Sequence, residues 1–392
     1  MPISVYLLAL CNAYMYICAS LLITISALIG FQLAPDKTLA TLPMALQFFA
    51  VMVTSIPASL LMGRIGRKAS FILASLIGVF GALVATWSLF NQNFWAFCIA
   101  TFCFGSFSAF GNYYRFTAAE VVEGKHKTLA ISYVMAGGVI AAFIGPNLAN
   151  LSQHLIPDYQ FAGGFAVLVG VYLLSLVTIS LTKLPPAPKR NVNRKSGRPL
   201  AVIMAQPVFV VAVICEMLGY GAMNLVMTST PLAMQMVEHN VADTAFVIQW
   251  HVVAMFLPSF FTGHLINRFG IVSVLAAGAL MGLICVGINL SGTTVTHFTL
   301  GLVMLGICWN FLFVGGTTLL TEAYEPDEKS KTQAANDFLV FTTVTITALS
   351  AGGVHYLYGW QSVNFVIIPL LIICLVGIAW LAVVRRTPAP SV

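Results

Sequence analysis

Long apolar runs, separated by short polar stretches, repeat from one end of the chain to the other. A helix that crosses the hydrocarbon core of a bilayer needs roughly 20 consecutive apolar residues. Each run reaches that length, so the pattern predicts an all-α membrane protein with twelve transmembrane helices. The predicted helices cover residues 4–28, 39–62, 69–90, 93–117, 128–150, 161–182, 206–230, 242–265, 271–290, 296–320, 332–353 and 362–384.

The composition is typical of a chain that is surrounded by lipid. Of the 392 residues, 59% are hydrophobic and only 8% are charged, and the mean hydropathy is +0.94. A soluble domain carries about 25% charged residues to cover its surface. The composition therefore excludes a cytosolic enzyme, a secreted domain, a nucleic-acid-binding protein and a disordered chain. It makes the lipid bilayer the first expected partner.

The chain divides into two six-helix halves. One longer polar stretch, residues 183–200, is rich in proline and basic residues, which predicts an extended cytoplasmic linker between residues 1–182 and residues 201–392. The halves also resemble each other in sequence. At an offset of 202 residues, Glu120 aligns with Glu322 and Glu123 aligns with Glu325. Two related halves around a midplane site are typical of secondary transporters.

The basic residues predict the orientation of the helices. If both termini are cytoplasmic, every lysine and arginine except Lys37 falls on the cytoplasmic side. Short cytoplasmic loops of membrane proteins carry an excess of these residues. We therefore expect a multi-pass protein with both ends in the cytoplasm. The first apolar run has no basic region before it and no A-x-A cleavage site, so we expect a retained span and not a signal peptide.

The turn after the second predicted helix resembles a signature of the major facilitator superfamily. It reads Arg64-Ile65-Gly66-Arg67-Lys68, and the stretch from Gly137 to Pro146 resembles the fifth-helix motif of the same superfamily. The resemblance implies the major facilitator fold, with Arg64, Gly66, Arg67 and Lys68 in a cytoplasmic gating loop. One departure is Gly63, where that superfamily usually has an acidic residue, so we expect a weaker charge latch here.

Three charged residues lie within or at the edge of apolar runs. Glu216 falls near the middle of the seventh predicted helix, whereas Arg115 and Asp337 lie closer to helix ends. A charge inside a bilayer is costly and is often kept for function. Glu216, Asp337 and Arg115 are therefore candidates for coupling or charge compensation. The alternative is a structural role, with hydrogen bonds to neighbouring helices.

Two helical pairs of soft ligands suggest a metal path. Met223 and Met227 are four residues apart in the seventh predicted helix, and His251 and Met255 are four apart in the eighth. Residues at this spacing share one face of a helix. A short outer loop joins the two helices, so we expect them to be antiparallel neighbours whose soft ligands converge. Thioether and imidazole groups suit Cu(I), although methionine is also a common filler of helix contacts.

A second set of sulfur residues lies in the first predicted helix. Cys11, Met15 and Cys18 fall within one narrow arc of that helix. They form a candidate secondary metal path. Packing between helices is the alternative.

The paired motif, together with Cys215, resembles the CcoA-type copper importers. These are major facilitator proteins that supply copper for assembly of haem–copper cytochrome oxidase in bacteria. The resemblance implies a secondary importer of copper in the bacterial inner membrane, with a cytoplasmic copper chaperone as a further partner. It makes Met223, Met227, His251, Met255 and Cys215 the expected metal ligands, with copper as cargo and no resident cofactor.

Two other functions remain open. Riboflavin importers belong to the same wider group and lack the paired motif, so an organic solute such as riboflavin is the alternative cargo. Aromatic side chains offer stacking surfaces for it: Tyr14, Tyr16, Tyr113, Tyr114, Trp250 and Trp309. A non-transporting receptor or assembly scaffold is the third hypothesis. No P-loop, catalytic triad or zinc pattern is present, so we do not expect an enzyme.

Overall fold

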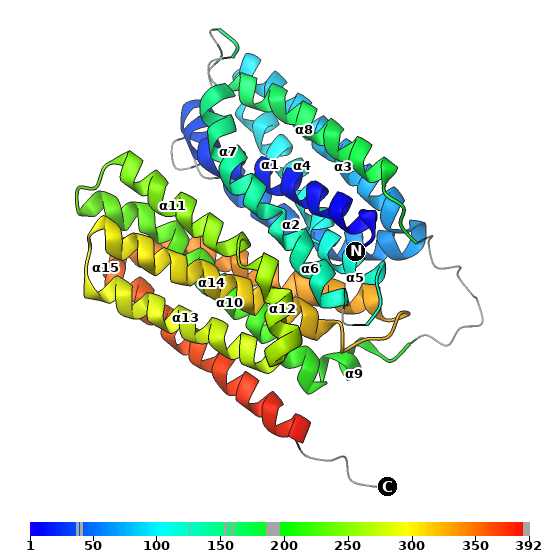
Figure 1. The fold of residues 1–392 in the computed structure, drawn as a ribbon. Helices are drawn as coiled ribbons and strands as arrows, with labels where there is room; N and C mark the ends of the chain where they lie inside the picture. Colours follow the sequence, from blue (N-terminus) through cyan, green and yellow to red (C-terminus); the bar gives the residue numbers. More distant parts are fainter. Residues whose placement is uncertain are drawn as a thin grey trace. The chain divides into compact units, whose positions relative to one another are not determined.

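The computed structural model of the chain is built from helices connected by short loops (Figure 1). It describes residues 1–36, 39, 42–124, 126–152, 155–157, 159, 161–185 and 197–386. Lys37 and residues 186–196 of the predicted linker lie outside these ranges. The helices are α1 (Ile3–Leu33), α2 (Leu42–Ile65), α3 (Arg67–Phe90), α4 (Phe94–Gly111), α5 (Tyr114–Glu120), α6 (His126–Ala136), α7 (Gly138–Ser152), α8 (Ala162–Leu181), α9 (Leu200–Met204), α10 (Pro207–Met236), α11 (Val241–Phe256), α12 (Ser259–Phe269), α13 (Ile271–Ser291), α14 (Val295–Leu320) and α15 (Lys329–Arg386).

The helices confirm the predicted all-α membrane fold. Within the described residues, 11 helical segments are long and apolar enough to cross a bilayer, and α11 with α12 makes a twelfth if this pair, bent by 40°, is one span. Two spans are merged in α15, which is kinked at Gly359, where φ is 77°. Helices α4 and α5 together form one span, from Phe94 to Glu120. The kink at Gly359 lies between the predicted helices 332–353 and 362–384, whereas the break between α4 and α5 falls inside the single predicted helix 93–117.

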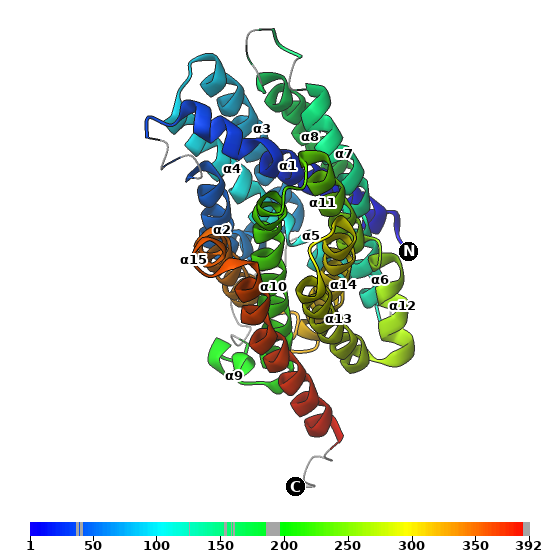
Figure 2. The same ribbon diagram turned by 90° about the vertical axis from the view of Figure 1, so that its left-hand side faces the viewer.

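The chain forms two compact units. Unit 1 holds residues 1–193 and 333–341, and unit 2 holds residues 194–332 and 342–392. In unit 1, α1 packs against α7 and α8, and α4 packs against α2 and α3. In unit 2, α14 packs against α10, α11 and α13, and Figure 2 shows α13 beside α14. The predicted division into residues 1–182 and 201–392 did not anticipate that residues 333–341, from α15, group with unit 1.

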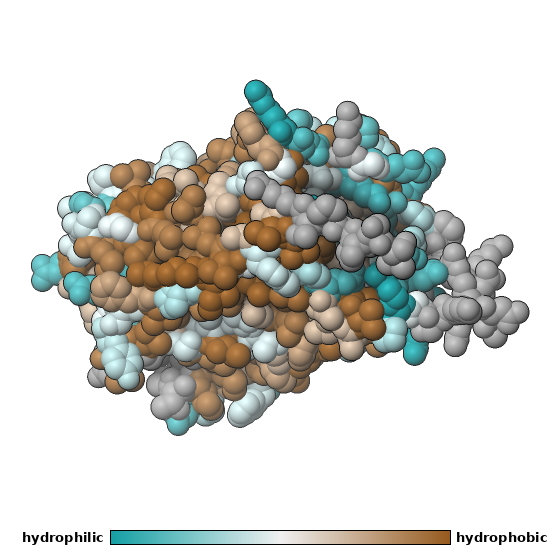
Figure 3. All heavy atoms as spheres, turned by 90° about the horizontal axis from the view of Figure 1, so that it is seen from below, coloured by the Kyte–Doolittle hydropathy of each residue, from teal (hydrophilic) through white to brown (hydrophobic). Residues whose placement is uncertain are grey.

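Apolar side chains cover the outside of the helices as well as the core. Leu174, Val177 and Leu181 of α8 are exposed, whereas Leu168 and Tyr172 of the same helix are buried. Hydrophobic residues form a broad area on the face drawn in Figure 3. Such a surface is stable in lipid, because the helices satisfy their own backbone hydrogen bonds and need no water.

The internal repeat is visible in the backbone. Gly66 ends α2 with φ at 87°, and Gly270 ends α12 with φ at 82°. Each glycine N–H donates to the carbonyl four residues earlier, at Met62 (3.0 Å) and Ile266 (2.9 Å) respectively. Only glycine adopts this backbone conformation without strain. The Arg-x-Gly turns of the two halves therefore share one local structure.

An ion pair joins Arg198, which precedes α9, to Glu328 in the loop between α14 and α15. The Arg198 backbone N–H and Nε both donate to Glu328 Oε1, at 2.7 and 2.9 Å, and its Nη2 donates to Oε2 at 2.6 Å. The Glu325 backbone N–H also donates to Glu328 Oε2, at 3.0 Å. The Arg198 guanidinium and these hydrogen bonds hold the pKa of the buried Glu328 carboxyl down at about 2.

Glu328→Gln should lower the unfolding temperature at neutral pH, because the amide loses the charge that Arg198 binds. A carboxyl whose pKa is depressed in the folded state stabilises the protein above its ordinary pKa of 4.5, and this contribution is lost as pH falls toward about 2. The difference between wild type and variant should therefore shrink between pH 5 and about pH 3.

Thermal unfolding of the purified protein in detergent, followed by tryptophan fluorescence, measures this difference. Glu123→Gln, at an exposed position, is the control and should match wild type throughout. If Glu328→Gln and wild type unfold at the same temperature at pH 7, the Arg198–Glu328 ion pair does not stabilise the protein.

Candidate functional site

A buried ion pair lies in unit 1. Arg115 Nη2 of α5 donates to Asp337 Oδ1 at 2.8 Å. Asp337 is 0% exposed and Arg115 is 2% exposed. Asn336 Nδ2 donates to the same Asp337 oxygen at 3.0 Å. Two charges far from water need such partners, because the loss of either one leaves an uncompensated charge in an apolar interior.

A second charged contact joins the predicted gating loop to α5. Arg67 Nη2 donates to Glu120 Oε1 at 2.6 Å and to Gln333 Oε1 at 2.7 Å. Lys68 Nζ donates to the carbonyl of Ser180 at 2.6 Å. Arg64 is exposed. Glu120 thus supplies a carboxylate to this loop, in which Gly63 has none.

The side chains predicted to be soft metal ligands contact different neighbours in unit 2. His251 is completely buried, and its Nδ1 lies 2.7 Å from the carbonyl oxygen of Leu302 on α14. A carbonyl only accepts, so Nδ1 carries the proton and the neutral ring has its lone pair on Nε2. Within the described part of the chain, Nε2 has no hydrogen-bond partner. Met223 and Met255 are buried, and Met227 is partly exposed.

Helices α10 and α11 each pack along α14, and they touch each other only slightly. The Cys215 thiol of α10 lies near the thiol of Cys374 on α15, which donates to the Ile214 carbonyl at 3.8 Å. Glu216 is buried and packs beside Gly316 of α14, where an added Cβ would lie 2.5 Å from its Cγ. No group of three or more His, Cys, Asp or Glu side chains in the described ranges could hold a metal ion. The convergence of Met223, Met227, His251 and Met255 stays a prediction.

The sulfur residues of α1 lie in packing contacts of unit 1. Cys11, Met15 and Cys18 are all buried. Cys11 lies near Ser175 and Cys18 lies near Tyr172, both on α8. The Met15 sulfur occupies the space beside Gly111, where an added Cβ would lie 2.3 Å from it. These contacts fit helix packing, and the secondary metal path stays a prediction.

An aromatic cluster lies in the core of unit 2. The Trp309 ring stacks on Phe313, with centroids 4.8 Å apart and planes at 16°. Tyr220 and Phe256 meet Trp309 edge-on, each at 5.5 Å. Trp309 is completely buried, and its indole N–H has no acceptor in the described part of the protein. We call Tyr220, Phe256, Trp309 and Phe313 the Trp309 cluster.

The other aromatic residues proposed for stacking lie elsewhere. Trp250 is 45% exposed on the outside of α11. Tyr113 and Tyr114 are buried in unit 1, where the Tyr113 hydroxyl donates to the carbonyl of Ser55 at 3.1 Å. Tyr14 and Tyr16 are partly exposed on α1. In the described part of the chain, Tyr114 is also fully buried with a hydroxyl that has no hydrogen-bond partner, and it packs on one ring, that of Phe71, at 4.6 Å. Trp309 differs because it contacts three aromatic rings.

One asparagine holds the break between α11 and α12 beside this cluster. Asn310 Nδ2 of α14 donates to the Met255 carbonyl and to Ser259 Oγ, each at 2.6 Å. Thr262 Oγ1 donates to Asn310 Oδ1 at 2.6 Å. Pro258 interrupts the helix here because it has no N–H to donate. Asn310 thus supplies the polar contacts that a continuous helix would supply itself.

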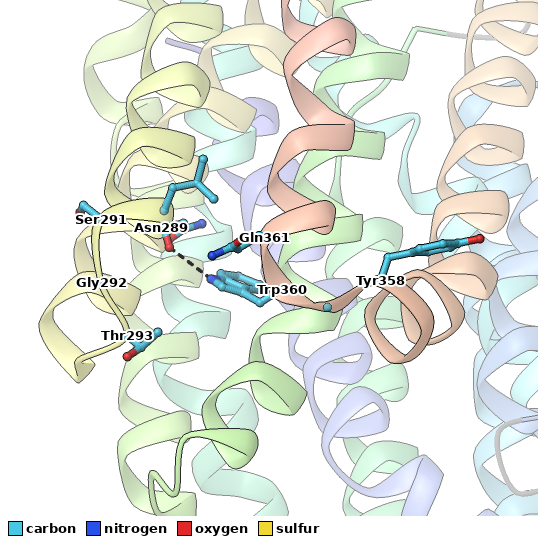
Figure 4. A pocket seen from close by; sticks show the side chains of 9 residues that line it. Asn289, Ser291, Gly292, Thr293, Tyr358, Trp360 and Gln361 are labelled. Carbon is cyan, nitrogen blue, oxygen red and sulfur yellow. Dashed lines mark hydrogen bonds between the residues drawn. The ribbon is translucent and has the colours of Figure 1, made fainter.

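A separate cavity of about 410 Å³ opens near the ends of α13 and the kink of α15 (Figure 4). Asn289, Thr293, Tyr358 and Trp360 are among its lining residues. The Trp360 indole N–H donates to the Asn289 carbonyl at 3.3 Å. No predicted site residue lines this cavity, so it is not the predicted metal site.

The apolar helices and the repeated turn define a multi-spanning helical membrane protein. The chain matches the family model of the Major Facilitator Superfamily over residues 7–249 and again over residues 214–392. The chain therefore belongs to the Major Facilitator Superfamily.

Two curated relatives cover most of the chain. It is 37% identical over 357 residues to the riboflavin transporter RfnT of Brucella anthropi, covering 91% of this chain and 90% of that protein. It is 27% identical over 371 residues to the uncharacterized transporter YddS of Bacillus subtilis, covering 90% and 85% respectively.

Solved structures of the same fold are more distant in sequence. The fucose:proton symporter FucP of E. coli superposes with a TM-score of 0.76 at 18% identity, covering 98% of this chain and 99% of that chain. The human organic anion transporter MFSD10 superposes with a TM-score of 0.75 at 13% identity, covering 96% and 100% respectively. These likenesses show the fold.

Asn310→Leu should destabilise unit 2 by about 1–3 kcal/mol, the usual cost of leaving buried polar groups without partners. The substitution removes the hydrogen bonds to Met255, Ser259 and Thr262 at the helix break. Chemical or thermal unfolding in detergent measures the loss. Ser291→Ala removes an exposed hydroxyl and should have no measurable effect. If Asn310→Leu is as stable as wild type, the hydrogen bonds of Asn310 do not stabilise the break between α11 and α12.

Proposed function

We propose that the chain is a secondary transporter that takes up riboflavin or a closely similar flavin. The observation that carries this proposal is the 37% identity to a riboflavin transporter over 91% of the chain. Neither the family match nor the relatives support copper as the cargo, so they favour the organic-solute alternative over the predicted copper importer.

The Trp309 cluster offers the chemistry that a flavin needs. The isoalloxazine ring is flat, aromatic and rich in carbonyl and ring-nitrogen acceptors. Trp309 provides an indole N–H that has no acceptor among the described residues, and Tyr220, Phe256 and Phe313 surround it with apolar ring surface. Aromatic contacts add roughly 0.5–1.5 kcal/mol beyond buried area. We therefore assign Trp309 as the donor that recognises the flavin.

Uptake of radiolabelled riboflavin tests the proposal in a bacterial strain that can neither make nor import the vitamin. Expression of the chain should restore growth at low external riboflavin and produce saturable uptake. Growth and uptake that stay at the level of empty-vector cells, with the chain present in the membrane, contradict the proposal.

Trp309→Phe refines the same test. An aromatic ring remains, although it is smaller than the indole, and the N–H is lost, so the apparent KM should rise by about 2- to 10-fold, the equivalent of one neutral hydrogen bond. The maximal rate and the amount of protein should change little. Trp250→Phe, at an exposed position, is the matched control. Equal KM values for both variants remove Trp309 from the flavin site.

Copper is the second candidate cargo, because one structural observation favours it. The buried His251 ring is held through Nδ1, and within the ranges that the structure describes the lone pair of Nε2 has no hydrogen-bond partner. Metal-binding histidines are usually oriented in this way, by a hydrogen bond from the ring nitrogen that does not bind the metal. The thioether of Met255 follows four residues later on α11.

The copper hypothesis makes its own prediction in the same cells. If the chain transports copper, cells that express it should take up radioactive copper in a saturable manner. His251→Leu should abolish this uptake. Under the flavin proposal we expect copper uptake equal to empty-vector cells, with or without the substitution. Saturable copper uptake that depends on His251, together with absent riboflavin uptake, reverses the order of the two candidates.

A further inference from the structure

Three buried side chains form a row along one face of α14 in unit 2. Trp309, Phe313 and Thr317 follow one another at intervals of four residues, and they are 0%, 2% and 0% exposed, respectively. At the rise and rotation of an α-helix, the row spans about 12 Å along the axis within an arc of about 80°. We call these three residues the α14 row.

The contacts of α14 show which side of the helix carries this row. Gly316 faces α10, because an added Cβ would lie 2.5 Å from Cγ of Glu216. Asn310 faces α11, where its side chain donates to the carbonyl of Met255 at 2.6 Å. By helical rotation the α14 row projects between these two directions. The Trp309 cluster agrees, because it includes one ring from α10 and one ring from α11.

The Thr317 hydroxyl lacks the partner that other threonines of α14 have. Thr299 and Thr318 each donate to the carbonyl four residues earlier, at 2.7 and 2.8 Å. Thr317 Oγ1 is buried and has no hydrogen-bond partner among the residues that the structure describes. A buried hydroxyl without a partner is costly. A bound solute that supplies the missing partner accounts for this position.

The α14 row and riboflavin present matching groups in the same order. At one end of the row is the Trp309 indole N–H, in the middle is the Phe313 ring, and at the other end is the Thr317 hydroxyl. Riboflavin joins a flat aromatic ring with carbonyl acceptors to an uncharged ribityl chain with several hydroxyl groups. A threonine hydroxyl both donates and accepts. A flavin ring placed against Trp309 and Phe313 therefore brings the ribityl chain toward Thr317.

We propose that Thr317 is a specificity-determining residue whose hydroxyl binds the ribityl chain of riboflavin. The inference rests on the proposed function and adds an orientation of the flavin along α14. Binding at this buried row requires that the site opens during the transport cycle, as in alternating access. A site that hydrogen-bonds a substrate hydroxyl rejects analogues that lack it. The chain should therefore prefer riboflavin to lumiflavin, which has the same ring and a methyl group in place of the ribityl chain.

Competition between the two flavins measures the role of the Thr317 hydroxyl. In cells that neither make nor import riboflavin, uptake of the radiolabelled vitamin by the expressed chain gives its KM. Inhibition of this uptake by lumiflavin gives the Ki of lumiflavin. Thr317→Val removes the hydroxyl and nearly keeps the shape. It should raise the KM of riboflavin by about 2- to 10-fold, the equivalent of one neutral hydrogen bond, and leave the Ki of lumiflavin within about twofold.

Matched variants separate recognition from packing. Thr317→Ser retains a hydroxyl and should restore most of the affinity that Thr317→Val loses. Thr318→Val removes a hydroxyl that donates within its own helix and should match wild type with both flavins. Trp309→Phe changes the contact with the ring that both flavins share, so it should raise both constants. Immunoblots of membranes measure the amount of each variant. If Thr317→Val does not reach the membrane, Thr317→Ala removes the same hydroxyl and carries the same expectation.

Three results overturn the inference and leave the flavin proposal in place. The first is a riboflavin KM that Thr317→Val does not change. The second is an equal rise in the riboflavin KM and the lumiflavin Ki, which indicates lost packing and not a lost bond to the ribityl chain. The third is a wild-type chain that binds both flavins equally well. A wild-type chain that takes up no riboflavin contradicts the proposed function itself, and the inference is then wrong as well.

Discussion

The cost of placing a polar group in hydrocarbon governs this structure. Only 8% of the residues are charged, and the buried ones have specific partners. Arg115 pairs with Asp337 at 2.8 Å, and Arg67 pairs with Glu120 at 2.6 Å. A charge without a partner in such surroundings would cost several kcal/mol. The same rule explains Asn310, which satisfies the polar groups at the break between α11 and α12. Interactions of this kind decide which helix faces which.

Much of the fold could be predicted from the sequence, because lipid imposes a simple length rule on apolar runs. The turn from Arg64 to Lys68 was visible as a superfamily signature, and the structure shows that Gly66 and Gly270 adopt the same conformation with positive φ. The breaks within spans were harder. Pro258 gave a usable signal for one of them, and the kink of α15 at Gly359 falls between the predicted helices 332–353 and 362–384. The short helix α9 had no such signal. Local conformation inside a long apolar run leaves little trace in hydropathy.

The candidate site was less predictable, because helical spacing fixes a face but not its neighbour. The i, i+4 pattern correctly places His251 and Met255 on one helix, yet His251 meets Leu302 of α14. Arg115 and Asp337 were singled out separately, and their contact spans 222 positions of sequence. Only the three-dimensional packing brings them together. The cargo is harder still, since related folds carry different solutes through changes at few residues. A four-residue copper motif and a whole-chain likeness to a riboflavin transporter therefore point to different cargoes.

Binding to the purified chain tests the central claim most directly. Isothermal titration of the detergent-purified protein with riboflavin, and separately with Cu(I), compares the two cargoes without relying on cellular uptake. The account predicts saturable heat with riboflavin at one site per chain. Saturable heat with Cu(I), together with none from riboflavin, would contradict it.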